Sequence, residues 1–193
     1  MMFLPAKTVK AAIFALLCCL LVSGCAQDYK FFLDDHTEVS LIRRIAVLPF
    51  ANHTQTKLVE HRFRNVVTTE ILSNGLFDVV ESGDIQRFLD EELRKGVVEL
   101  STEMAKKMGR ELDIDTYLVG AVDMYEEKRN GSYSYPVVAL TMRLIEIKSN
   151  KIIWQASGSE SGYGTLSRIF GFASKDFNQV SFRLAQKLMR TMY

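Results

Sequence analysis

Cysteine and proline are scarce in this sequence, and neither sign of charge dominates it. The 193 residues include three Cys, three Pro and one Trp, with 24 Lys and Arg against 23 Asp and Glu. So few prolines exclude a proline-rich stalk. The balanced charge argues against a nucleic-acid partner, which would select a basic surface.

The first 24 residues have the pattern of a secretion signal. Lys7 and Lys10 precede the apolar run 11–21, which is too short to span a bilayer. The run ends in Val22-Ser23-Gly24-Cys25, where small residues directly precede a cysteine. This tetrapeptide resembles the bacterial lipobox, which implies cleavage before Cys25 and acylation of its thiol. The alternative is an ordinary signal peptide with an incidental cysteine.

Acylation at Cys25 has consequences for chemistry and for location. Cys18 and Cys19 would leave with the signal peptide, so no thiol would remain for a disulfide or a metal cluster. More than one acyl chain anchors a protein stably, whereas a single chain binds only marginally. Lipoproteins of the inner membrane typically carry Asp after the cysteine, and here Ala26 follows it. The resemblance therefore implies lipid anchoring at the periplasmic face of the outer membrane.

We predict three regions along the chain: a signal peptide over 1–24, the lipidated cysteine with a short tether over 25–40, and a single α/β domain over 41–193. The tether is polar and mixed, and a flexible chain of its length spans on the order of 20 Å. Its aromatic residues Phe31 and Phe32 have two interpretations, contact with lipid headgroups or packing against the domain.

Hydrophobic periodicity predicts the elements of the domain. Continuous or alternating apolar runs predict strands, 3.6-residue spacing predicts helices, and Asn130-Gly131 predicts a hairpin turn. The expected order is β-α-β-α-α-β-β-β-α, which predicts an α/β sandwich with a mixed, mostly antiparallel sheet and helices packed on it. The segments are strands near 44–50, 76–81, 117–125, 137–147 and 151–159, and helices near 59–74, 82–95, 102–108 and 177–188.

Four segments carry a family resemblance: 44–52, 75–81, 112–121 and 149–154. They are similar to the succession found in periplasmic lipoproteins with a TolB amino-domain-like fold, a group that includes CsgG, LpoB and PelC. The resemblance covers roughly residues 43–190. Its motifs are core and turn positions, so it implies the fold more strongly than the function.

Extra hairpins and the length of the linker distinguish the members of that group. CsgG-like channels need extra amphipathic hairpins, LpoB-like activators use a long flexible linker, and neither feature is evident here. The build is closest to the PelC type. That resemblance implies a ring-forming homo-oligomer, without catalytic activity, that guides an extracellular polysaccharide to a β-barrel exporter. The alternative is a monomeric accessory lipoprotein that regulates an envelope enzyme or assembly, LpoB-like or CsgG-like.

Candidate contact residues lie in the last third of the chain. In PelC-like proteins a Trp after a glycine-containing turn is associated with membrane contact, so the resemblance makes Trp154 a candidate for membrane or subunit contact. Alternation along its strand allows either face, and the alternative is a core tryptophan beneath a helix. Tyr163 and Phe170 lie in a glycine-rich, apolar stretch that could form the same kind of contact or could pack beneath the last helix.

Motifs for catalysis are weak. His36, His53 and His61 do not have metal-ligand spacing, and we find neither a phosphate-binding loop nor a nucleophile motif. The acidic run 90–92 is interpreted as a solvated helix face. We therefore predict a protein that is not an enzyme and that has no cofactor and no metal.

Overall fold

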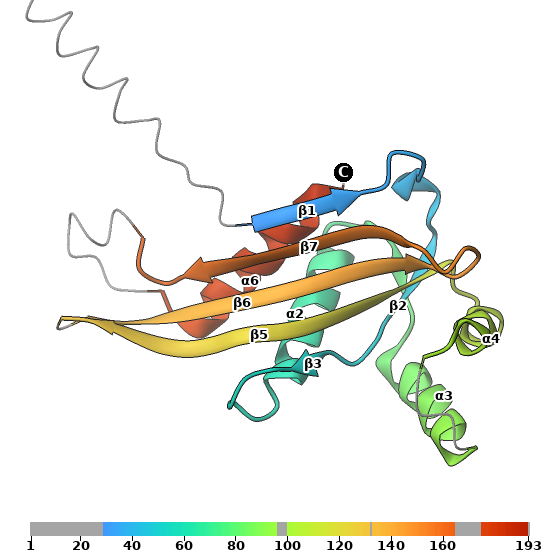
Figure 1. Cartoon of the computed structure of the whole chain (residues 1–193), viewed down its shortest axis with the longest axis horizontal. Helices are drawn as coiled ribbons and strands as arrows, with labels where there is room; N and C mark the ends of the chain where they lie inside the picture. Colours follow the sequence, from blue (N-terminus) through green and yellow to red (C-terminus); the bar gives the residue numbers. More distant parts are fainter. Residues whose placement is uncertain (1–28, 96–99, 132, 165–174, 193) are drawn as a thin grey trace, which may run out of the picture.

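The fold is known from a computed structural model that describes residues 29–95, 100–131, 133–164 and 175–192 (Figure 1). In chain order its elements are β1 (Tyr29–Leu33), η1 (Val39–Leu41), β2 (Arg44–Val47), β3 (Ala51–Asn52), α2 (Val59–Ser73), β4 (Asp78–Val79), α3 (Ser82–Arg94), α4 (Thr102–Leu112), β5 (Thr116–Asn130), β6 (Tyr133–Glu146), β7 (Ile152–Ser161), α6 (Phe177–Met189) and η2 (Arg190–Met192).

The strands form one seven-stranded sheet with the order β1-β7-β6-β5-β2-β4, and β3 also pairs with β5. The strands β5, β6, β7 and β1 are antiparallel neighbours, whereas β2 runs parallel to both β4 and β5. This arrangement confirms the predicted α/β fold with a mixed, mostly antiparallel sheet. The predicted hairpin turn at Asn130-Gly131 joins the two longest strands, and Gly131 adopts the positive φ that such a turn requires.

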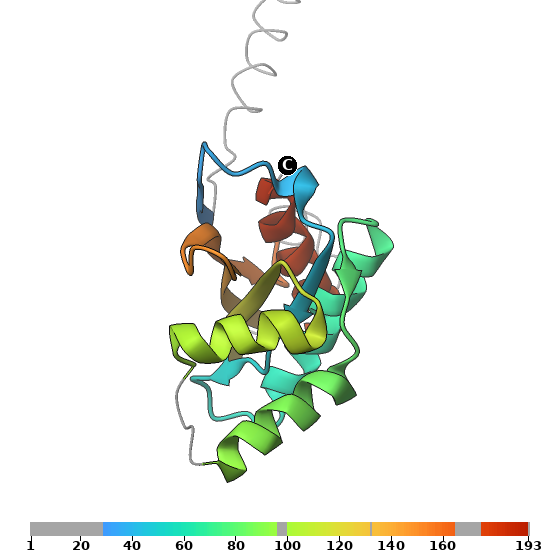
Figure 2. The ribbon, with the colours of Figure 1, turned by 90° about the vertical axis from the view of Figure 1, so that its right-hand side faces the viewer.

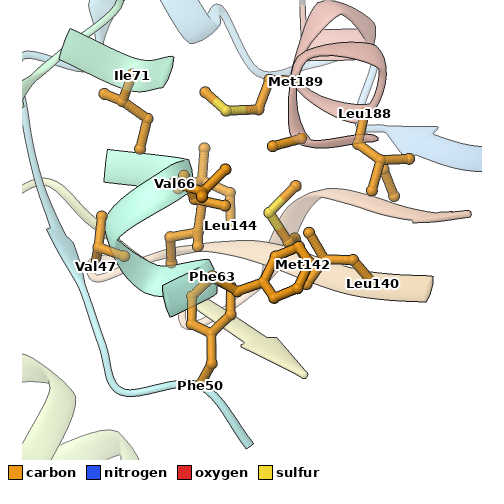
Figure 3. Close-up of a cluster of buried hydrophobic side chains, with 14 of the residues drawn as sticks. Val47, Phe50, Phe63, Val66, Ile71, Leu140, Met142, Leu144, Leu188 and Met189 are labelled. Carbon is orange, nitrogen blue, oxygen red and sulfur yellow. The ribbon is translucent and has the colours of Figure 1, made fainter. Parts of the chain in front are cut away.

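Two helices, α2 and α6, cover one face of the sheet. Their buried residues, among them Phe63, Val66 and Leu188, join Leu140, Met142 and Leu144 of β6 in the main hydrophobic cluster (Figure 3). Alternate residues of β6 are buried because successive side chains of a strand point to opposite faces. The face toward α2 and α6 therefore contains the larger part of the core.

The opposite face of the sheet is covered at one end only. There α3 and α4 pack over Ala46, Leu48 and Tyr117 in a second, smaller cluster, and Figure 2 views the molecule from that end. Beyond this cluster, the side chains of β5, β6 and β7 that point away from α2 and α6 are at least partly exposed. We call this uncovered part of the sheet the open face.

The structure corrects the N-terminal boundary of the domain. Residues 29–33, predicted as part of the tether, form the edge strand β1, which pairs with β7 from Tyr29 opposite Gly158 to Leu33 opposite Trp154. Tyr29 and Leu33 pack against the main cluster, which explains why this segment is ordered as a strand. The sequence analysis also missed β3, and β4 is shorter than the strand predicted over 76–81.

A second correction concerns the acidic run 90–92. Asp90 and Glu91 are exposed, but Glu92 is buried, because it follows Ile85 by seven residues and so returns to the buried face of α3. Its carboxylate lies 2.6 Å from Nζ of Lys107 on α4 and 3.0 Å from Nζ of Lys95. These hydrogen bonds, foremost that from Lys107, lower the pKa of Glu92. The pair joins α3 to α4.

We expect the Glu92 ion pair to make stability depend on pH. Since the pKa of Glu92 is lowered in the folded state, its contribution is present above the ordinary glutamate pKa and is lost as the pH falls through the folded value. Glu92→Gln should be less stable than the wild type near neutral pH, and the difference should shrink in acid. Urea unfolding at a series of pH values measures this. Glu91→Gln, at an exposed neighbour, should leave the pH profile unchanged.

A close approach between Gly120 of β5 and the ring of Phe50 provides a test of the core. A Cβ at residue 120 would lie 2.5–2.7 Å from three ring carbons of Phe50, which is buried in the main cluster. Gly120→Ala should therefore lower the free energy of unfolding by about 1–3 kcal/mol. Gly83→Ala, where a Cβ meets nothing within 4 Å, should leave it unchanged or raise it by up to about 1 kcal/mol. Equal effects of the two substitutions would contradict this packing.

Candidate interaction surfaces

Trp154 is a core residue. Its side chain is 0% exposed, belongs to the main cluster, and donates a hydrogen bond from its indole nitrogen to Oγ1 of Thr191 at 2.9 Å. The prediction that Trp154 contacts the membrane or another subunit is therefore wrong in this structure, and the alternative, a tryptophan beneath a helix, is correct.

An irregularity in β7 explains why simple alternation did not predict the face on which Trp154 lies. Leu144 pairs with Trp154, whereas Ile145 pairs with Ile152, so Ile153 is an extra residue in β7. Such a bulge breaks the alternation of faces. Ile153 and Trp154 are accordingly both buried in the same cluster, although they are consecutive.

Tyr163 lies in an aromatic cluster at the far end of the β5–β6 hairpin. Its ring stacks on Tyr135 with a centroid distance of 5.1 Å and on Tyr133 with a distance of 6.0 Å. Tyr133 is 53% exposed, so the cluster reaches the surface. The sequence analysis named Tyr163 but missed both partners, which alternate along β6 just after the hairpin turn. The other predicted site residues, Cys25 and Phe170, lie outside the described residues.

A row of polar side chains crosses the open face. Nδ1 of His53 lies 3.1 Å from Oδ1 of Asp123, and the other carboxylate oxygen accepts a hydrogen bond from Oγ1 of Thr141 at 2.6 Å. Oγ1 of Thr141 lies 2.9 Å from Oγ of Ser157. Asp123 lies on the open face by ordinary alternation from the buried Val122, and the register shift between Val122 and Met124 places Met124 on the same face.

The order of groups in this row differs from that of a Ser-His-Asp arrangement. Nδ1 of His53 contacts the carboxylate of Asp123, and this carboxylate, rather than the imidazole, accepts the hydrogen bond from the hydroxyl group of Thr141. Among the described residues, no group of three His, Cys, Asp or Glu side chains is placed to hold a metal ion. Likewise, no helix in the described part of the chain has the length and apolarity to span a bilayer.

Small side chains surround the row. Alanine, serine and threonine occupy several central open-face positions of the three antiparallel strands, and all are at least partly exposed: Ala121, Ala139, Thr141, Ser157 and Ser159. A surface of small side chains allows another backbone or a flat partner to approach closely. The arrangement is suited to contact between macromolecules.

Comparison with known proteins places the chain in a family. The sequence model of the family described as peptidoglycan-synthase activator LpoB matches residues 30–159, more than half of the chain. The chain belongs to this family. The match begins within β1 and ends within β7, so β1 is part of the family domain. Members of this family activate a synthase and are not themselves catalysts, which confirms the prediction that the chain is not an enzyme. No curated protein sequence matches the chain.

Solved structures share the fold. The PelC dodecamer from Paraburkholderia phytofirmans is similar with a TM-score of 0.59 and 18% identity, and the match covers 85% of this chain and 96% of that one. Lipoprotein GNA1162 from Neisseria meningitidis is similar with a TM-score of 0.54 and 15% identity, covering 77% and 97%. The family match, together with this shared fold, confirms the predicted resemblance to the group that includes LpoB and PelC. At such identities the structural likenesses establish the fold alone.

The burial of Trp154 can be tested by its fluorescence, because this is the only tryptophan of the chain. We expect blue-shifted emission and weak quenching by acrylamide in the folded protein, since the indole is fully buried beneath α6 and η2. The same protein unfolded in urea is the control and should be quenched strongly. Equal quenching before and after unfolding would contradict a core position for Trp154.

Proposed function

We propose that this protein is a lipoprotein, anchored through Cys25 at the periplasmic face of the outer membrane, that serves as a non-catalytic, ring-forming component of an envelope export system. The exported material that best suits the PelC-like build is an extracellular polysaccharide, passed to a β-barrel exporter. The observation that carries the proposal is the short distance between Cys25 and the folded domain.

The corrected domain boundary makes that distance shorter than the sequence analysis expected. Because β1 begins at Tyr29, only Ala26, Gln27 and Asp28 separate it from Cys25. Four residue steps span at most about 14 Å even when fully extended. An acylated Cys25 would therefore hold the domain against the membrane surface, where a component of an export channel has to lie.

Self-assembly has two kinds of support. The similar PelC protein forms a dodecamer, and the match covers 96% of that chain, so the shared part is nearly its whole domain. The open face of the present protein has small side chains at several central positions, which suits the close approach of a second copy. We infer a homo-oligomer without assigning the number of subunits.

A second candidate function comes from the family itself. The family description names a peptidoglycan-synthase activator, so a regulator of an envelope synthase is the alternative. An activator that reaches across the peptidoglycan to a synthase in the inner membrane needs a long linker. The three residues between Cys25 and β1 do not provide that reach, so we rank the export function first.

Lengthening the connection separates the two functions. A flexible Gly/Ser insert of roughly 40 residues between Asp28 and Tyr29 would add a typical span of about 35 Å. In a strain that lacks the chromosomal gene, the lengthened protein should fail to restore surface polysaccharide, because the ring would no longer lie at the membrane. An activator would keep or gain activity, measured as incorporation of peptidoglycan precursors.

Two controls make this experiment decisive. The same insert appended after Tyr193 leaves the distance from Cys25 to β1 unchanged and should restore export. Cys25→Ser should release the protein from the membrane fraction and abolish export. Full restoration of polysaccharide by the lengthened protein would argue against the export function, and a purely monomeric mass of the detergent-solubilised lipoprotein by light scattering would argue against the ring.

A further inference from the structure

The outer edge of β1 is an exposed apolar strand. It pairs with β7 on one side, and among the described strands none pairs with its other side. Phe31 and Phe32, on opposite faces of this strand, are 52% and 53% exposed. Proteins usually protect such an edge with charges, proline or a cover, because an apolar edge strand promotes association. Here the only charged residue within the strand is Lys30.

A third exposed apolar side chain lies on the same side of the molecule. Leu41 of η1 is 71% exposed, the largest exposed fraction among the large hydrophobic residues of the described chain. Figures 1 and 2 both show β1 and η1 at the same end, beside the C-terminal helix, while α3 lies at the opposite end. The exposed apolar residues of β1 and η1 therefore belong to elements at the same end of the molecule.

We propose that this surface, Phe31, Phe32 and Leu41, lies in the headgroup region of the membrane that carries the lipid anchor. The inference rests on the proposed acylation of Cys25. Four residue steps place Tyr29 within about 14 Å of the anchored cysteine. The headgroup layer is itself several ångströms thick, so an edge strand that starts this close begins near it and can lie along it.

A lipid interface fits the strand better than a pairing protein strand does. A partner strand would satisfy the free backbone edge, but Phe31 and Phe32 project from opposite faces and each would be covered only in part. The headgroup layer surrounds an edge from both faces and contains water for the backbone amides. Aromatic rings prefer this layer, and Tyr29 at the start of the strand adds a ring with a polar tip.

Depth-dependent quenching tests the proposal on the full lipidated protein. Phe31→Trp and Phe32→Trp each add one tryptophan at an exposed position, and the native Trp154 is buried and supplies a constant background. In phosphatidylethanolamine–phosphatidylcholine vesicles that contain brominated lipid, both variants should lose emission relative to vesicles without bromine. Wild-type emission should not change.

The matched control is Leu93→Trp on α3, a residue that is 59% exposed and lies at the opposite end of the molecule. It should not be quenched. Quenching at residues 31 and 32 no stronger than at 93, in protein that co-sediments with the vesicles and unfolds like the wild type, would overturn the inference. If Phe31→Cys forms cross-links between two copies and the tryptophan variants are not quenched by lipid, the edge of β1 pairs with a second copy instead.

Co-sedimentation with vesicles tests the lipid anchor independently of the quenching experiment. If wild-type protein expressed with its signal peptide does not co-sediment with vesicles, or sediments no better than Cys25→Ser, then the anchoring in the proposed function fails and the inference fails with it. If the wild type sediments and the tryptophans at 31 and 32 stay unquenched, only the inference is overturned.

Discussion

The pairing of β5 with β6 is the interaction on which the rest of this structure depends. Fourteen residue pairs, from Thr116 with Glu146 to Asn130 with Tyr133, fix which side chains of both strands face α2 and α6. A slip by one residue would move Leu140, Met142 and Leu144 out of the core. The other strands extend this central pair on both sides, and the helices cover the faces that it defines. The β5–β6 hairpin therefore determines which side chains lie on the open face and where the tyrosine cluster forms.

Sequence patterns predicted the regular parts of this fold because those parts repeat one period over many residues. The order of the helices and long strands was accessible in this way, and the Asn130-Gly131 pair located the turn between the two longest strands. The error at Trp154 arose because a local irregularity changed the period. The extra residue Ile153 placed two consecutive residues of β7 in the core.

Two further errors came from tertiary contacts that no local pattern contains. Glu92 looked like part of a solvated acidic run, but Lys107 from α4 allows it to be buried. The segment 29–33 lies in a stretch of mixed, polar sequence. It forms a strand because it pairs with the edge of β7 and because Tyr29 and Leu33 pack against the main cluster. The tyrosine cluster was found only in part for the same reason, since two of its rings come from β6 and the third comes from the loop after β7.

The recruitment of residues 29–33 into the sheet links fold to function. A free segment of that length would let the domain move away from its anchor, whereas a paired β1 leaves only three residues between Cys25 and the sheet. With Cys25 acylated as proposed, the orientation of the domain would be a property of the fold, because the edge that carries Phe31 and Phe32 would be the part nearest the anchored cysteine. The proposed non-catalytic component would act through this fixed placement, since every anchored copy would present the same face at the same height above the membrane.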